Sequence, residues 1–81
     1  MGRTARRSEV QTELGDRVRK RRKQLGLSQM ALAERIGLHF SFVSEVERGT
    51  RNLSLESLLR VAEGLEVDPG VLVKGLRRSP G

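Results

Sequence analysis

Residues 29–48 of this chain read QMALAERIGLHFSFVSEVER, and the arrangement of the rest of the domain follows from them. Leu32, Ala33 and Ile36 recur at helical spacing, and Gly37 then interrupts the period. A second apolar period of the same kind begins in the segment FVSEVER. The spacing therefore predicts two short helices that share one core.

Both ends of the first of these helices carry residues that are typical of helix boundaries. Ser28 precedes it with a side-chain oxygen that can cap free N–H groups, and Gly37 follows it as a residue that readily adopts the left-handed conformation. Ala33 is small enough for the second helix to cross closely over the first. Two helices joined by such a turn form a helix-turn-helix motif, which we expect over residues 28–48.

Apolar residues at helical spacing continue on both sides of the motif. One stripe precedes it: Val10, Leu14, Val18 and Leu25. Another follows it, after a capping Ser54: Leu55, Leu58, Leu59, Ala62 and Leu65. Asp68 and Pro69 then open a last short helix. The expected fold is an all-α, compact five-helix domain over residues 8–74, with a flexible basic arm at residues 1–7 and a flexible tail at residues 75–81.

The composition argues against several classes of protein. The 81 residues allow one domain, and they include no cysteine and one histidine, His39. We therefore expect no disulfide, no metal or cofactor site and no set of catalytic partners, so the protein should not be an enzyme. No apolar run approaches the roughly 20 residues of a membrane span, which favours a cytoplasmic protein.

The net charge of +6 is concentrated in the first third of the chain. Residues 1–27 hold nine Lys or Arg against three Asp or Glu, whereas residues 28–81 hold seven of each. Such an excess beside a helix-turn-helix motif favours a polyanionic partner, double-stranded DNA, over a basic surface that only aids solubility.

Several residues of the motif carry a resemblance to a known family. Gln29, Ala33, Gly37, Val43 and Val46, followed by Glu47-Arg48-Gly49, resemble the signature of the Cro and phage-repressor, or Xre-like, helix-turn-helix proteins of bacteria and phages. The segments RNLSLE (residues 51–56) and VDP (residues 67–69) are similar to small stand-alone members, including the controller proteins of restriction–modification systems. The resemblance implies a lambda-repressor-like fold and a transcriptional regulator that binds a palindromic operator as a homodimer.

In proteins with this motif, the second helix lies in the major groove with its first residues at base edges. The expected reading helix spans residues 39–48, and its outward side carries the candidate base contacts His39, Phe40, Ser41, Ser44 and Glu45. By resemblance, Gln29 is expected to hold a phosphate, and Arg48, Arg51 and Asn52 occupy loop positions that contact DNA in small relatives.

Three of these positions leave alternatives open. Phe40 can press on a thymine methyl group or pack, as Phe42 can, on neighbouring protein. Either His39 or Ser41 can cap the reading helix, and the choice moves the reading register by two residues. Glu45 can accept a hydrogen bond from a cytosine amine or remain solvated.

Two opposite charges fall on inward faces of the predicted helices. Arg22 lies four residues after Val18, and Glu47 lies four residues after Val43. The resemblance implies a buried ion pair between Arg22 and Glu47. The alternative is two long side chains that reach solvent separately.

The last helix is the expected dimer interface, through an apolar set that can alternatively close the core of the monomer: Val67, Val71, Leu72 and Val73. A rival function is an antitoxin-like module that holds a partner protein and binds DNA only secondarily. The sequence leaves open the operator, the sign of regulation and the existence of a partner protein.

Overall fold

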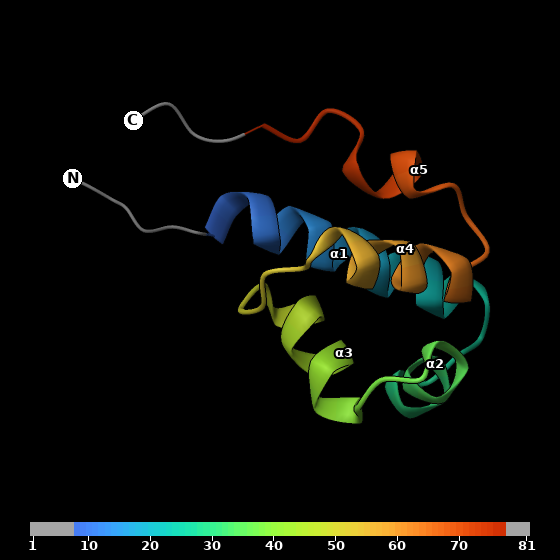
Figure 1. Cartoon of the computed structure of the whole chain (residues 1–81). Coiled ribbons are helices and arrows are strands. Elements are labelled where there is room, and N and C mark those ends of the chain that lie inside the picture. The colour runs from blue at the N-terminus through green and yellow to red at the C-terminus, as the bar shows by residue number, and fades with distance from the viewer. Residues whose placement is uncertain (1–7, 78–81) are drawn as a thin grey trace.

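The computed structural model describes residues 8–77, and within this range the chain forms five helices and no strand (Figure 1). The helices are α1 (Ser8–Gln24), α2 (Gln29–Ile36), α3 (Phe40–Arg48), α4 (Leu55–Gly64) and α5 (Pro69–Val73). The all-α, five-helix fold expected from the sequence is therefore confirmed. The predicted arm at residues 1–7 and the last four residues of the predicted tail lie outside the described residues.

The turn between α2 and α3 is built by the two boundary residues that the sequence indicates. Ser28 Oγ accepts the N–H of Ala31 at 3.0 Å and so caps the start of α2. Gly37 ends α2 in the left-handed conformation, with φ at 71°. The N–H of Leu38 then donates to the carbonyl of Ala33 at 3.0 Å, which closes the helix end. These local contacts fix the direction in which α3 leaves the turn.

The five helices enclose one core. In Figure 1, α2 and α3 make up the lower part of the molecule, and α1, α4 and α5 make up the upper part. Helix α3 packs on α1 and α2, while α5 packs on α4 and α1. The largest fully buried side chains come from all five helices and the turn after α4: Leu32, Leu65, Leu72, Val18, Val43 and Val61. The core thus joins the helix-turn-helix motif to the rest of the domain.

Helix α1 approaches α3 closely at a glycine. A Cβ atom added to Gly15 would lie 2.4 Å from the carbonyl oxygen of Val46 and 2.8 Å from that of Glu47. Both obstacles are backbone atoms, so they cannot turn aside as a flexible side chain can. The contact between α1 and α3 therefore depends on the absence of a side chain at this position.

Helix α4 buries only part of the apolar stripe that the sequence predicts. Leu55 and Leu59, both expected in the core, are 72% and 46% exposed, whereas Val61 is 2% exposed. Leu58 packs against the core and Ala62 is fully buried, as expected. The prediction was wrong for Leu55 and Leu59 because helical spacing gives the direction of a side chain but not whether another element lies opposite it.

Candidate nucleic-acid interface

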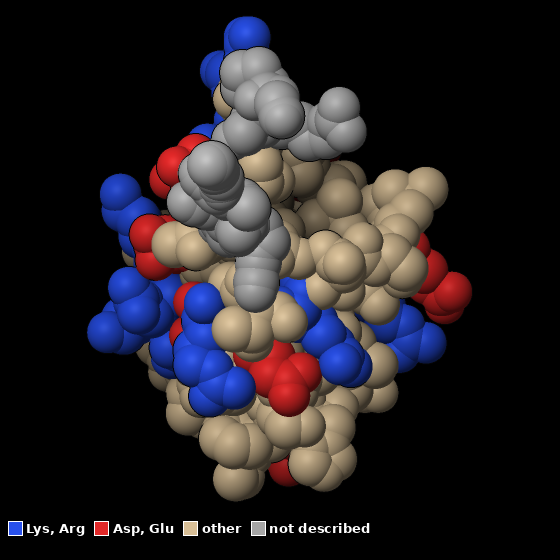
Figure 2. Space-filling model, turned by 90° about the vertical axis from the view of Figure 1, so that its left-hand side faces the viewer, with Lys and Arg blue, Asp and Glu red and all other residues tan. Residues whose placement is uncertain are grey.

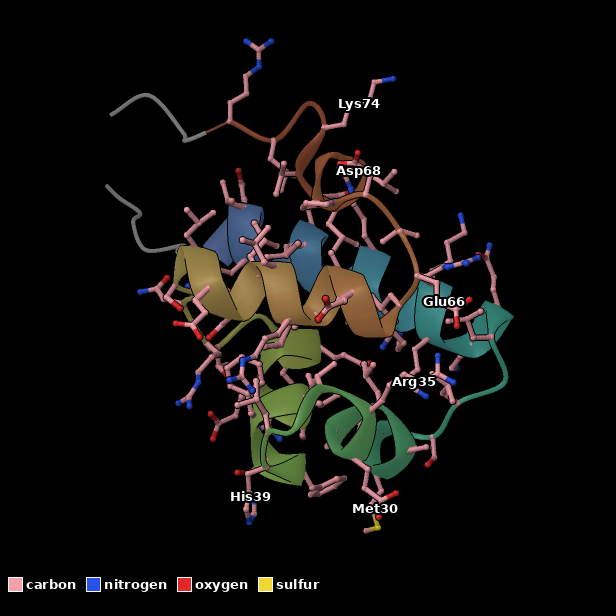
Figure 3. All side chains as sticks on the ribbon, turned by 45° about the vertical axis from the view of Figure 1, so that its right-hand side comes forward. Met30, Arg35, His39, Glu66, Asp68 and Lys74 are labelled. Atoms are coloured by element: carbon pink, nitrogen blue, oxygen red, sulfur yellow. The ribbon has the colours of Figure 1, made fainter. Side chains whose placement is uncertain are left out.

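His39 caps α3 and defines where this helix begins. Its Nδ1 accepts the backbone N–H of Ser41 at 3.1 Å and lies 3.0 Å from the Ser41 hydroxyl. Because an accepting nitrogen carries no proton, the proton of the neutral ring lies on Nε2. Helix α3 starts at Phe40, so the alternative cap at Ser41 is excluded. Figure 3 shows His39 pointing away from the body of the protein, at the same edge as Met30 of α2.

Helix α3 has one buried and one accessible face. The buried residues are Phe42, Val43, Val46 and Glu47. The candidate contacts at the helix start, His39, Phe40 and Ser41, are exposed, and the next two, Ser44 and Glu45, are half-buried. The two aromatic residues separate, because Phe40 is 43% exposed and Phe42 only 7%. Phe42 therefore belongs to the core, and the Phe40 ring is available to a partner.

A buried ion pair joins α1 to α3. Arg22 Nε and Nη2 donate to Glu47 Oε2 and Oε1 at 2.6 and 2.9 Å, and both residues are less than one-tenth exposed. Arg22 Nη1 also donates to the carbonyl of Leu27 at 2.8 Å. The hydrogen bond to Glu47 raises the pKa of the Arg22 guanidinium, against the opposing effect of burial. The two charges on inward faces thus meet, and separate solvation is excluded.

The same carboxylate holds Gln29 at the start of α2. Gln29 Nε2 donates to Glu47 Oε1 at 3.0 Å, a contact that the sequence did not indicate. An amide nitrogen carries two N–H groups, so one remains available to a phosphate oxygen. Glu47 therefore connects the packing of α3 on α1 with the orientation of Gln29.

The loop after α3 lies against the reading helix. Arg51 Nη1 lies 3.3 Å from Glu45 Oε1, so Glu45 has a partner rather than being only solvated. Arg48 Nη1 donates to Ser44 Oγ at 3.4 Å. Asn52 is exposed and accepts a hydrogen bond from a side chain of α1. Arg48, which the sequence predicts in the loop, is the last residue of α3, because the helix continues to the left-handed Gly49. Of the two loop residues, Arg51 lies beside the second turn of α3 and Asn52 contacts α1.

Two arginines of α1 donate hydrogen bonds to backbone carbonyls near the end of the chain. Arg17 donates to the carbonyls of Leu72 and Lys74 at 3.1 and 2.7 Å, and Arg21 donates to the carbonyl of Leu65 at 2.9 Å. Figure 2 shows Lys and Arg in separate groups around an acidic group, above a mainly uncharged lower part. Within α1, the basic side chains therefore do not all belong to one free basic surface.

One residue of the predicted dimer interface on the last helix, α5, is buried inside the monomer. Leu72 is 1% exposed and belongs to the core, so it cannot contact a second copy of the folded chain. Val67 packs partly against the core, whereas Val71 and Val73 are 57% and 38% exposed. The reason is that α5 turns one side inward between α1 and α4, and Leu72 lies on that side.

One apolar residue at the edge of the motif was missed by the sequence analysis. Met30 is 59% exposed and follows Gln29 directly. The available signal was its position outside the buried stripe of α2.

Within residues 8–77, no cluster of His, Cys, Asp and Glu could hold a metal ion. In the same part of the chain, no helix combines the length and apolarity needed to cross a membrane.

Comparison with known proteins identifies the family to which this chain belongs. A helix-turn-helix family model matches residues 18–72, which include the whole motif. Control protein C.SmaI of Serratia marcescens is 36% identical over 75 residues, which are 90% of this chain and 89% of that protein.

Two solved structures of restriction–modification controller proteins share the fold. C.AhdI from Aeromonas hydrophila has a TM-score of 0.75 at 44% identity, and the match covers 76% of this chain and 94% of that one. C.Esp1396I, as a tetramer in complex with its natural 35 base-pair operator, has a TM-score of 0.76 at 32% identity, with 85% and 91% covered. The chain therefore belongs to the Xre-like helix-turn-helix family of DNA-binding transcriptional regulators.

Proposed function

We propose that this regulator acts as a homodimer on a palindromic operator, with α3 of each copy in the major groove. The observation that carries the proposal is the contrast between the two faces of α3. Its inner face is held to α1 by the pair of Arg22 and Glu47, and its outer face presents accessible side chains. A helix fixed in this way can offer donors and acceptors to base edges without first becoming ordered.

Each exposed residue at the start of α3 has a distinct chemical use in a groove. The Ser41 hydroxyl can donate to or accept from a base, and His39 Nε2–H is an outward donor. The Phe40 ring can contact a thymine methyl group. Gln29, held by Glu47, has one N–H left for a phosphate. In this arrangement phosphate contacts set the docking and base contacts set the specificity.

A two-fold dimer follows from the small footprint of one reading helix. One helix reaches only a few base pairs, whereas two helices about 34–36 Å apart read successive turns of the same groove. Val71 and Val73 supply exposed apolar surface on α5 for the contact between copies. The tetramer of C.Esp1396I on one operator supports a mode of binding in which several copies share a site. The role needs no catalytic group or cofactor, and it places the protein in the cytoplasm with its DNA.

Selection of bound fragments from genomic DNA, followed by footprinting, tests the proposal. The expected result is a two-fold symmetric sequence whose half-site centres lie about one helical turn apart. Sedimentation of the protein alone should show a dimer. An enriched sequence without two-fold symmetry, or a monomer that binds one half-site tightly, would contradict the dimer. Recovery of no preferred DNA would instead favour the antitoxin-like alternative.

A further inference from the structure

Glu45 and Arg51 form an ion pair on the accessible side of α3. Arg51 Nη1 lies 3.3 Å from Glu45 Oε1. The Arg51 side chain is 47% exposed and the Glu45 side chain 35%. The same guanidinium lies over the ring of Phe42, 5.0 Å from the ring centroid. Phe42 is 7% exposed, so its ring is a fixed part of the core. Arg51 is therefore held between a rigid ring and an acidic side chain of the reading helix.

The loop that carries Arg51 is anchored on both sides of it. Before it, the N–H and the hydroxyl of Thr50 both donate to the carbonyl of Glu45, at 3.0 and 3.2 Å. After it, Asn52 accepts a hydrogen bond from Gln11 of α1. Thr50 thus ties the backbone before Arg51 to α3, and the side chain of the residue after Arg51 contacts α1. The contact between Arg51 and Glu45 is a consequence of the fold rather than of a chance loop conformation.

We propose that Arg51 is a positioning residue that presents the Glu45 carboxylate to the exocyclic amine of one cytosine in each half-site. The assignment rests on the proposed function and adds a specificity mechanism to it. An ionised carboxylate only accepts hydrogen bonds, and in the major groove the bases donate from cytosine N4 or adenine N6. Cytosine is the better match, because adenine also offers an acceptor at N7 that a carboxylate cannot satisfy.

Glu45 needs a cation beside it to approach DNA. An unpaired carboxylate on the reading helix would be repelled by the phosphates on both sides of the groove. Arg51 lies 3.3 Å from this carboxylate, so its positive charge offsets the repulsion and favours the orientation in which the two groups meet. Its remaining N–H groups stay available to a phosphate. One arginine can therefore anchor the backbone and aim a neighbouring acceptor at the same time.

A lysine at this position would keep the charge but lose the geometry. The guanidinium lies over the Phe42 ring, 5.0 Å from its centroid, and its planar fork donates in fixed directions. An ammonium group is instead a compact charge on a flexible chain. Arg51→Lys therefore separates positioning from simple attraction to phosphate. Its matched control is Arg19→Lys, since Arg19 also pairs with an acidic residue, Asp16 at 3.4 Å, but on the surface of α1.

The test measures the affinity of the full chain for the selected operator, for each of its single-base variants and for random-sequence DNA. Glu45→Ala should lose about tenfold of discrimination at one base position of each half-site. Arg51→Lys should lose discrimination at that same position, and the double variant should lose no more than either single variant. The affinity of Arg51→Lys for random DNA should stay within about threefold, because the number of positive charges is the same. Arg19→Lys should retain the whole preference profile.

Three results would overturn this assignment while leaving the proposed function in place. The first is a wild-type profile in Arg51→Lys together with an altered one in Glu45→Ala, which would mean that Glu45 reads without Arg51. The second is an unaltered profile in Glu45→Ala. The third is a loss in Arg51→Lys at a different base position, which would mean that Arg51 reads a base itself. Wild-type protein without any base preference would refute the proposed function and this assignment with it. Melting curves of every variant establish that the chain is folded.

Discussion

Replacing Glu47 by alanine should remove most of the stability of the fold. The carboxylate accepts hydrogen bonds from Arg22 Nε, Arg22 Nη2 and Gln29 Nε2, at 2.6, 2.9 and 3.0 Å. Without it, the guanidinium of Arg22, which is 8% exposed, keeps the carbonyl of Leu27 as its one partner among residues 8–77. Stranding a buried charge in this way costs about 3–5 kcal/mol, and the lost Gln29 hydrogen bond adds about 1 kcal/mol. A domain of this size has only about 5 kcal/mol in total, so the variant should be largely unfolded.

Thermal and urea unfolding followed by circular dichroism measure this loss. The matched control is Asp16→Ala, which breaks an ion pair with Arg19 at 3.4 Å whose side chains are both more than half exposed. That pair should contribute no more than about 1 kcal/mol, because solvent screens it. The double variant Arg22→Met/Glu47→Leu should be more stable than Glu47→Ala, since it leaves no unpaired buried charge.

An unfolding free energy of Glu47→Ala no lower than that of Asp16→Ala would refute the reasoning. It would mean that the Arg22 guanidinium is solvated in solution and that the pair does not hold α3. The pH dependence has a definite sign as well. Glu47 raises the pKa of Arg22, so the stability due to its protonation is complete below the usual arginine pKa and is lost only above about pH 12. Arg22 should therefore add no pH dependence over about pH 5–9.

Gly15→Ala should lower the unfolding free energy by about 1–3 kcal/mol, because the new Cβ would lie 2.4 Å from the carbonyl oxygen of Val46 and would push α1 away from α3. A gain in stability from the better helix propensity of alanine would contradict this. Val71→Glu should give a folded monomer in sedimentation velocity, since this side chain is 57% exposed, and a variant that stays dimeric would place the interface elsewhere. Ser41→Ala should cost about 1–3 kcal/mol of discrimination at one base position of each half-site. Gln29→Ala should weaken binding evenly across sequences, and the reverse pattern for the two variants in competition assays would refute the docking.

Features that depend on neighbouring residues could be read from the sequence. Ser28 caps α2 and Gly37 ends it in the left-handed conformation, because both act through backbone groups within one turn. The inward direction of Val43 and Glu47 on α3 likewise follows from helical spacing. These features were sufficient for the all-α fold, the helix-turn-helix motif and the side of α3 that can face DNA.

Contacts between side chains that are distant in the sequence could be predicted from it only in part. The meeting of Arg22 and Glu47, 25 residues apart, came from a family resemblance and from inward placement rather than from spacing alone. The capping role of His39 could not be separated from that of Ser41, because both residues can present an acceptor and only the observed hydrogen bond distinguishes them.

By itself, then, the sequence determined the five helices, most of their boundaries and the motif, because hydrogen bonds and caps along a helix involve residues three or four positions apart. Only the tertiary structure decided which apolar residues have a neighbour. It leaves Leu55 exposed and buries Leu72, although both lie on apolar stripes of their helices. It also brings Gln29 to Glu47 and places Arg51 over the ring of Phe42. These contacts depend on how whole helices lie against one another, and the spacing of residues along one helix carries no information about that arrangement.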